Sequence, residues 1–175
     1  MSMELWDLLD KDRRPLEQTH PRGRQYPMPH GTYHTVVTVY TVDDRGRLLL
    51  TRRAACKGMY PGWWEVTGGS GIAGEDSLTS ARRELREETG ITARELIPLG
   101  PFYPTCAYST EVIQMFLARG LSFGERELDE DEFLNVFRMP LQELVEKVLA
   151  GEIPDAKTQI AALRVWGMRQ KGLLG

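Results

Sequence analysis

The most informative part of this chain is the segment Gly69–Ile91, GSGIAGEDSLTSARRELREETGI. Its glycine-rich start predicts a loop of little steric bulk that ends at Gly74. Asp76 and Ser77 can cap a helix, and the residues that follow them are good helix formers. Gly90 then ends the helix, because glycine enters the left-handed conformation at low cost. The segment therefore predicts a loop, a helix and a turn in succession.

Two neighbouring faces of the predicted helix differ in their chemistry. Apolar residues at helical spacing predict its buried face: Leu78, Ala81 and Leu85. Glu84, Glu87 and Glu88 follow an i, i+3, i+4 spacing, which places them together on the adjacent face. Their mutual repulsion would be relieved by a cation, and Mg²⁺ typically binds through a few carboxylates together with substrate phosphates. We therefore expect a divalent metal here, with Arg83 orienting Glu84 or Glu87 from the side.

The same residues resemble the Nudix box without a mismatch. The matching pattern is Gly69, then Glu75 six positions on, then Arg-Glu-Leu-x-Glu-Glu-x-Gly-Ile over 83–91. The resemblance covers about Tyr33 to Leu149 and implies the α/β Nudix fold, an α/β/α sandwich with a mixed β-sheet and the box as a loop–helix–loop. It also implies a hydrolase, namely a pyrophosphatase that cleaves a pyrophosphate bond with Mg²⁺ or Mn²⁺ as its cofactor.

The resemblance implies catalytic and metal-binding roles for the charged residues of the box. Glu84 and Glu88 would be the main metal ligands. Glu87 would be a further ligand or the residue that draws a proton from water. Arg83 would act beside these carboxylates as part of the catalytic set.

The remaining box residues would support the site. The Gly68 carbonyl would complete the metal coordination, and Gly69 would bring the backbone close to the substrate phosphates, where a side chain would obstruct. Glu75 and Gly90 would be structural residues of the box.

Hydrophobic alternation and turn residues predict the elements around the box. The expected strands are Thr35–Val42, Arg47–Arg53, Gly62–Thr67, Leu96–Phe102, Glu111–Ala118 and Phe133–Met139. Helices are expected from Pro140 to about Ala150 and over Asp155–Lys171, the second with Ala156, Ile160, Leu163 and Trp166 on its inner face. Glu4–Leu9 and Pro15–Thr19 predict a small hairpin. We expect one domain over 1–175, with an N-terminal hairpin and loop extension over 1–32.

Two basic and two aromatic residues are candidates for binding the substrate. Arg52 and Arg53 end a predicted strand, and guanidinium groups bind phosphates in a bidentate manner, although plain surface arginines would give the same pattern. Trp63 and Trp64 are adjacent on a strand and therefore face opposite sides. One should enter the core, and we assign Trp64 as the residue that stacks on the substrate.

Three further residues are weaker candidates. Members of the family often use an acidic residue after the box as a base or metal ligand, which points to Glu132, although the run Glu125–Glu132 also fits a solvated loop. Tyr108 lies in a region where some Nudix subfamilies carry an aromatic residue that reads the substrate. His34 is expected to be a structural histidine at the start of a strand rather than a metal ligand.

Composition and charge limit the partners and the location of the protein. A net charge of −3 gives no general attraction to polymeric nucleic acid, so any nucleotide contact must be local. The partner that the Nudix resemblance implies is a small-molecule diphosphate. Cys56 and Cys106 are too few for a disulfide framework. The acidic N-terminus does not fit a signal peptide, and no apolar run approaches the roughly 20 residues of a membrane span. We expect a cytoplasmic protein; a homodimer is left open.

The favoured substrate is a nucleoside diphosphate linked to another moiety, and two alternatives stay open. Gly31–His34, Arg52–Ala54 and Tyr60–Trp64 are similar to the isopentenyl-diphosphate isomerase branch of the superfamily. That branch uses a Cys-x-His motif before the box, where this chain has Val66–Ser70 with neither residue. The second alternative is a non-catalytic module that senses nucleotides, but such modules usually lack box glutamates that are intact here.

Overall fold

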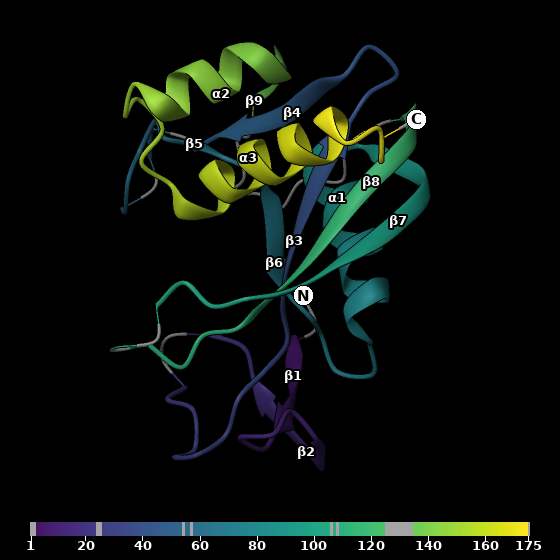
Figure 1. The fold of residues 1–175 in the computed structure, drawn as a ribbon. Helices are drawn as coiled ribbons and strands as arrows, with labels where there is room; N and C mark the ends of the chain where they lie inside the picture. Colours follow the sequence, from purple (N-terminus) through teal and green to yellow (C-terminus); the bar gives the residue numbers. More distant parts are fainter. Residues whose placement is uncertain are drawn as a thin grey trace.

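The computed structural model describes residues 3–23, 26–53, 55–56, 58–105, 107, 109–124 and 135–174. Figure 1 shows helices packed against a central β-sheet, with a small separate hairpin beyond one end of the sheet. None of the described helices is both long enough and apolar enough to cross a membrane.

The described strands of the central sheet run in the order β5-β4-β3-β8-β7, with β6 paired to β3 and β9 paired to β4. Their bounds are β3 (Val36–Val42), β4 (Arg47–Arg52), β5 (Trp64–Glu65), β6 (Thr67–Ser70), β7 (Ile91–Phe102), β8 (Ile113–Phe123) and β9 (Asn135–Pro140). β3 and β8 are parallel and the other pairs are antiparallel, so the sheet is mixed, as predicted.

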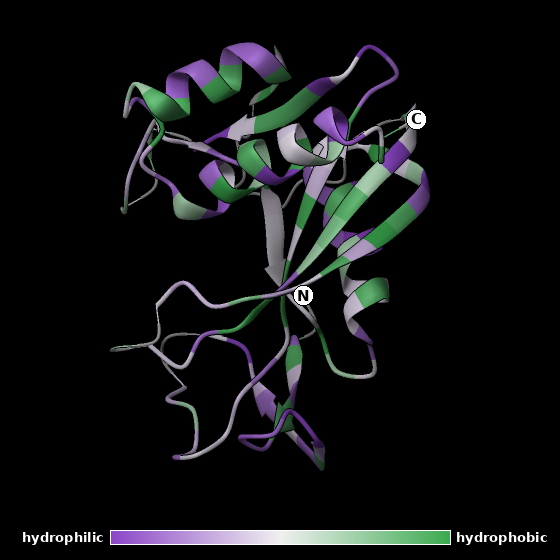
Figure 2. Cartoon of the chain, in the orientation of Figure 1, coloured by the Kyte–Doolittle hydropathy of each residue, from purple (hydrophilic) through white to green (hydrophobic). Residues whose placement is uncertain are grey.

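Helices cover both faces of the sheet: α1 (Ser77–Thr89) on one and α2 (Leu141–Leu149) with α3 (Ala156–Gln170) on the other. The alternation of side chains along β3 explains the two cores. Val39 packs with Leu85 of α1, whereas its neighbour Tyr40 packs with the α2–α3 layer. Figure 2 shows the corresponding change from hydrophobic to hydrophilic residues around α2. The predicted α/β/α sandwich is confirmed.

Local signals in the box correctly predicted the position of α1. The Asp76 carboxylate accepts a hydrogen bond from the Thr79 N–H at 2.7 Å, which caps the N-terminus of α1. Gly90 ends the helix at φ 69°, and its N–H donates to the Arg86 carbonyl at 2.8 Å. The helix therefore begins and ends where the sequence predicted.

Several predicted strands have other bounds in the structure, including those predicted over Gly62–Thr67 and Glu111–Ala118. Gly68 and Gly69 do not form a loop, because both lie in β6 and pair with β3. β7 begins at Ile91 rather than Leu96, since a long antiparallel pairing with β8 extends it to the end of the box. The predicted strand over 133–139 is confirmed from 135 onward as β9, and its first two residues lie outside the described part of the chain.

The predicted inner face of α3 is wrong in part. Ala156 is exposed and Leu163 is 44% exposed, whereas Ile160 and Trp166 are partly buried beside the core. The fully buried residues of this helix are Thr158, Ala161, Ala162 and Val165. Apolar residues surround much of α3, so the sequence did not single out one stripe, and small residues settle closest to the sheet and α2.

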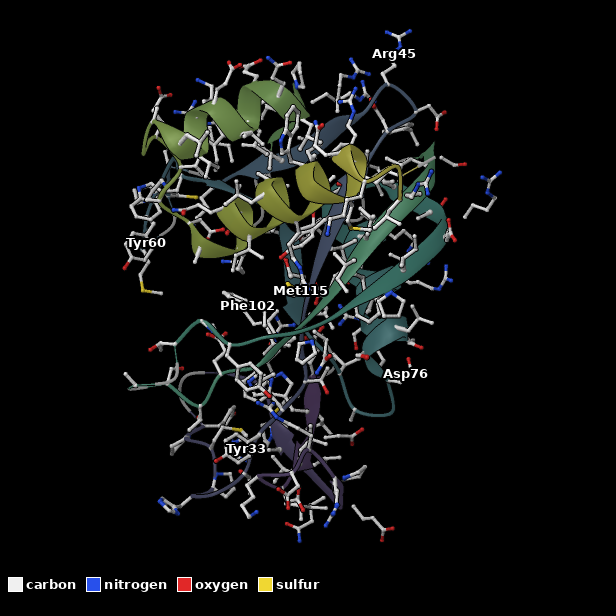
Figure 3. All side chains as sticks on the ribbon, viewed as in Figure 1. Tyr33, Arg45, Tyr60, Asp76, Phe102 and Met115 are labelled. Atoms are coloured by element: carbon white, nitrogen blue, oxygen red, sulfur yellow. The ribbon has the colours of Figure 1, made fainter. Side chains whose placement is uncertain are left out.

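The N-terminal hairpin is confirmed as β1 (Leu5–Leu9) paired antiparallel with β2 (Pro15–Pro21). It lies below the central sheet in Figure 1, and Figure 3 shows the labelled Tyr33 beside the hairpin. Leu9 forms an isolated bridge with Tyr33, and the Trp6 ring stacks on His34 with a centroid distance of 4.0 Å. His34, just before β3, thus anchors the hairpin to the sheet.

We expect acid to weaken this anchor. Burial lowers the pKa of His34 below its ordinary value of 6.5, so the unfolded chain takes up this proton more readily than the folded chain. The contribution of neutral His34 is therefore intact above about pH 6.5 and is lost as the pH falls below it. Denaturant titrations at about pH 7.5 and about pH 5.5 measure how much unfolding free energy is lost between the two pH values. This loss should be smaller for His34→Phe than for the wild-type protein, because Phe retains a ring against Trp6 but takes up no proton. An equal loss in both proteins would contradict the prediction.

Candidate active site

The box carboxylates lie where α1 crosses β6. Glu84 is 7% exposed, and its carboxylate lies directly against Gly69. A Cβ atom at position 69 would stand 2.5 Å from both Cδ and Oε1 of Glu84, closer than any real contact. Gly68 is equally constrained, because a Cβ there would lie 2.4 Å from the Val37 carbonyl oxygen of β3. The two glycines let the helix carboxylates approach the strand backbone.

Arg83 holds the carboxylates of the box in place. Its Nη1 atom donates to Glu84 Oε1 at 3.0 Å and to Glu87 Oε2 at 2.9 Å. Its Nε atom donates to Glu75 Oε1 at 2.9 Å, and Nη2 donates to the Ser70 carbonyl at 2.8 Å. One half-buried guanidinium therefore connects β6, the loop before α1 and two glutamates of the helix. The expected orientation of Glu84 and Glu87 by Arg83 is seen in these contacts.

Glu75, which was expected to be a structural residue of the box, accepts several hydrogen bonds. Besides Arg83, it accepts hydrogen bonds from the Ile72 N–H at 3.2 Å and the Ser80 hydroxyl at 3.0 Å. Although burial acts to raise the pKa of Glu75, the hydrogen bonds from Arg83, Ile72 and Ser80 outweigh it and lower the pKa. Glu75 is thus an ionised support for Arg83.

The three glutamates have different environments. Burial raises the pKa of Glu84, and the charge of Arg83 only partly opposes this rise. The Glu87 side chain is 32% exposed and is the one of the Arg83-bound pair that meets solvent. The Glu88 Oε2 atom accepts a hydrogen bond from the Gly68 N–H at 3.3 Å, which places this carboxylate beside β6. The glutamates therefore lie side by side but are held by different partners.

A divalent cation fits the donor chemistry of this face. All the groups involved offer oxygen, and a nearby cation would offset the desolvation that disfavours the ionised form of buried Glu84. Within the described ranges, however, no three Asp, Glu, His or Cys side chains converge tightly enough to enclose an ion.

The other substrate-binding candidates lie at the end of β4 (Arg52), just after it (Arg53) and on β5 (Trp64). Arg53 is engaged with Glu65, with Nη1 at 3.1 Å from the carboxylate, while Arg52 donates to the Gly62 carbonyl at 3.0 Å. Trp64 packs against the core and meets the Phe137 ring edge-on at 4.8 Å. The exposed member of the tryptophan pair is Trp63 rather than Trp64.

Two adjoining cavities connect this region with the box. The first, of about 280 Å³, is lined by Gly68, Gly69, Thr38 and Phe102 among others. The second, of about 300 Å³, is lined by Arg53 and both tryptophans among others. The cavities share four lining residues: Glu65, Asp155, Ala156 and Lys157. They form one groove that runs from the glycines of β6, past the start of α3, to the loop before β5.

Tyr60 and Trp63 lie together at one end of this groove, a juxtaposition that was not predicted from the sequence. Tyr60 is 58% exposed and Trp63 36% exposed, and their rings lie 4.4 Å apart with a tilt of 35°. Figure 3 shows Tyr60 projecting from the edge of the molecule below α3. Tyr60 adopts φ 52°, unusual for a residue with a side chain. The segment Tyr60–Trp63, with Pro61 and Gly62 at its centre, was a visible turn signal, but only the fold shows what it faces.

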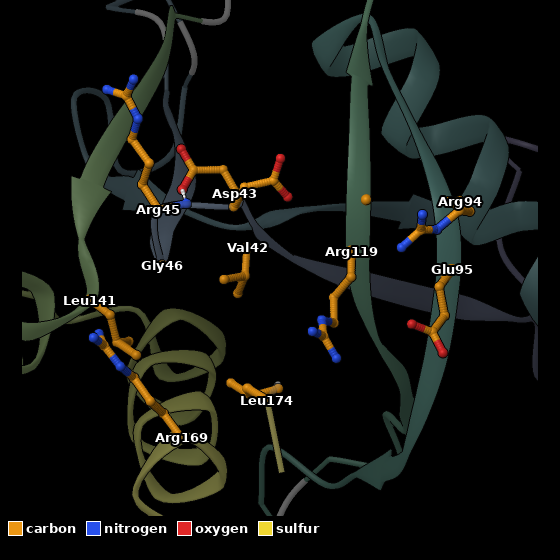
Figure 4. A pocket seen from close by; sticks show the side chains of 12 residues that line it. Val42, Asp43, Arg45, Gly46, Arg94, Glu95, Arg119, Leu141, Arg169 and Leu174 are labelled. Carbon is orange, nitrogen blue, oxygen red and sulfur yellow. Dashed lines mark hydrogen bonds between the residues drawn. The ribbon is translucent and has the colours of Figure 1, made fainter. Parts of the chain in front are cut away.

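A larger cavity, of about 450 Å³, lies elsewhere (Figure 4). Four arginines line it, from the β3–β4 turn, β7, β8 and α3: Arg45, Arg94, Arg119 and Arg169. It lies at the far end of β3 from the glycines of β6, and its lining includes no box residue. Two remaining candidates, Tyr108 and Glu132, lie outside the described residues.

The fold and the site together define a class of protein. The model of the NUDIX domain family matches residues 32–162, so the chain belongs to this family, and its class of enzyme is the Nudix pyrophosphohydrolase. The predicted recognition is confirmed.

Particular relatives are similar over most of the chain. An ADP-ribose pyrophosphatase from Bacillus subtilis is 37% identical over 143 residues, which cover 81% of this chain and 77% of that protein. An isopentenyl-diphosphate Delta-isomerase from Mycolicibacterium vanbaalenii is 31% identical over 150 residues, covering 81% and 80%. The crystal structure of DR0079 from Deinococcus radiodurans has the same fold, with a TM-score of 0.67 at 21% identity over 93% of this chain and 99% of that one.

Proposed function

We propose that this chain is a Mg²⁺- or Mn²⁺-dependent hydrolase of a nucleoside diphosphate linked to another moiety, with ADP-ribose as the first substrate to test. The observation that carries the proposal is the complete carboxylate set around Arg83, which holds Glu84 and Glu87 at 3.0 and 2.9 Å against the glycine strand. The relative named as an ADP-ribose pyrophosphatase supports this choice of substrate.

The proposed metal ligands are Glu84 and Glu88, together with the Gly68 carbonyl. The Gly68 N–H already faces Glu88, and N–H and carbonyl of one strand residue point to the same edge. When bound, the metal would neutralise the diphosphate and acidify a water molecule. Glu87, the more exposed glutamate at Arg83, is placed to accept a proton from that water. Arg83 would keep both Glu84 and Glu87 aligned.

The groove supports a linear, partly aromatic substrate. The diphosphate would lie at the Gly68–Gly69 end, beside the carboxylates and close to backbone groups. Lys157, whose Nζ atom lies 2.6 Å from Asp155 at the start of α3, would offer positive charge along the way. A planar base would stack on the exposed ring of Trp63. Trp64, Arg52 and Arg53 would then support the walls rather than bind the base.

An isomerase acting on an allylic diphosphate is the second candidate, because an isomerase relative is 31% identical over 80% of its own length. Isomerisation of an alkene needs a positioned acid and base. In this chain β6 and the residue before it read Val66–Ser70, VTGGS, and carry no thiol or imidazole. Hydrolysis therefore fits the residues of the groove better.

The test is phosphate release, coupled to a phosphatase where needed, from a panel of diphosphates. The panel holds ADP-ribose, an oxidised nucleoside triphosphate, a dinucleoside polyphosphate and an isopentenyl diphosphate, each with Mg²⁺, Mn²⁺ or a chelator. We expect metal-dependent turnover of ADP-ribose well above that of the other compounds. No turnover of any compound by folded, metal-loaded protein would remove the hydrolase proposal.

Trp63→Ala should raise KM for nucleoside substrates by about tenfold, the scale of a lost base–aromatic stack. Leu163→Ala, at an exposed position on α3, is the control and should leave KM unchanged.

A further inference from the structure

The N-terminal hairpin holds the loop that precedes the catalytic helix. The Leu5 carbonyl of β1 accepts a hydrogen bond from the Ala73 N–H at 2.8 Å. Two residues along the same strand, Asp7 Oδ2 accepts one from the Gly74 N–H at 2.7 Å. β1 lies before the residues that match the family model, which begin at position 32. A segment outside the family match therefore reaches into the box.

The loop held in this way supports Arg83. Glu75 follows Gly74 directly, and its N–H donates to the Ile72 carbonyl at 3.1 Å to close a turn. Gly74 itself adopts φ +87°, a conformation that glycine accepts readily. The Glu75 carboxylate then holds Arg83 Nε at 2.9 Å, and Arg83 holds Glu84 and Glu87. Three hydrogen-bonded steps and the Gly74–Glu75 peptide bond thus lead from the hairpin to the catalytic carboxylates.

Hydrogen bonds hold this loop more than packing does. A cavity of about 430 Å³ lies beside the contact of hairpin and loop and is lined by Asp7, Thr35, Gly74, Glu75 and Asp76 among others. The hairpin has its own anchors on the sheet, since Leu9 bridges to Tyr33 and Trp6 stacks on His34. Removing the Asp7 carboxylate would therefore take the acceptor from the Gly74 N–H beside this cavity without detaching the hairpin.

We propose that Asp7 is a positioning residue of the active site, which acts through Gly74, Glu75 and Arg83 to hold Glu84 and Glu87 in their catalytic arrangement. The inference rests on the proposed hydrolase function for its kinetic consequences. Its structural content, the placement of Glu75 and Arg83 by Asp7, does not depend on the substrate.

The experiment compares Asp7→Ala with Asp7→Asn in the full chain. The Asn side chain keeps an oxygen that accepts the Gly74 N–H, whereas Ala keeps none. Asp12→Ala is the matched control, because Asp12 is exposed in the β1–β2 turn and pairs only locally with Lys11. The readouts are kcat and KM for the substrate of the panel, hydrogen exchange of the Gly74 amide, and the NMR signal of the Arg83 Nε–H.

For Asp7→Ala we expect kcat to fall about tenfold or more, as for other supports of a catalytic site, with KM little changed. Gly74 exchange should become faster, and the Arg83 Nε–H signal should shift or broaden, while Asp7→Asn and Asp12→Ala stay near wild type. Unchanged exchange and an unchanged Arg83 signal in Asp7→Ala would overturn the proposal. Equal losses of kcat in Asp7→Ala and Asp7→Asn, in proportion to the fall in their melting temperatures, would also overturn it. A shifted Arg83 signal in a protein that hydrolyses nothing would retain the positioning role and remove the proposed function.

Discussion

Replacing Glu87 by Gln is expected to reduce turnover by about a hundredfold or more, the scale of losing a positioned base. Gln has nearly the same shape and keeps an oxygen for Arg83 Nη1, which now lies 2.9 Å from Glu87 Oε2. The fold should therefore persist while the charge and the proton acceptor are lost. Steady-state kinetics at saturating Mg²⁺ or Mn²⁺, with a thermal melt of each protein, measures the two effects separately.

The control for this variant is Glu143→Gln. Glu143 is an exposed glutamate in the first turn of α2, on the other side of the sheet from the box. It should keep wild-type turnover, so that a loss in Glu87→Gln reports the site and not the general loss of one negative charge. Near-wild-type turnover of Glu87→Gln at saturating metal would remove the proposed base, although Glu84 and Glu88 could still hold the metal.

Replacing Gly69 by Ala should harm both activity and stability. The new Cβ would meet the Glu84 carboxylate at 2.5 Å, and Glu84 cannot easily withdraw because it is buried and held by Arg83. Overpacking of this kind costs about 1–3 kcal/mol. Displacing a catalytic group by about 1 Å can lower the rate by about a hundredfold. We expect both effects, measured by denaturant titration and by kcat at several metal concentrations.

Gly167→Ala in α3 is the matched control for Gly69→Ala. Apart from its chain neighbours and the adjacent helix backbone, no heavy atom of the described residues lies within 4 Å of a Cβ built at Gly167. In a helix interior this substitution should stabilise the protein by about 0.5–1 kcal/mol, and it should leave kcat unchanged. Gly69→Ala protein with wild-type kcat and stability would show that the strand backbone can move away from Glu84 at little cost.

Features with local causes could be predicted from the sequence. The Asp76 cap, the Gly90 stop and the i, i+3, i+4 spacing of the glutamates act within one helix, so α1 and its carboxylate face follow from the order of residues alone. The strand-rich segments and the N-terminal hairpin follow in the same way, because alternation and turn residues are also local signals.

Features set by distant contacts could not be predicted. Gly68 and Gly69 looked like a loop because the pairing that makes them a strand comes from β3, about thirty residues earlier. The choice between Trp63 and Trp64 depends on Phe137 of β9, which covers Trp64 and leaves Trp63 exposed. Glu75 was expected to be a structural residue of the box, but its contact with the Arg83 guanidinium depends on the fold.

The hairpin also limits how far the chain can be truncated without a loss of contacts at the site. A fragment cut at the borders of the family match would begin at residue 32, and the amides of Ala73 and Gly74 would lose the acceptors that β1 supplies. At its other border, residue 162, such a fragment would lose the second half of α3 and with it the fully buried Val165. The residues that match the family model therefore do not include all those that contact the box loop and the core.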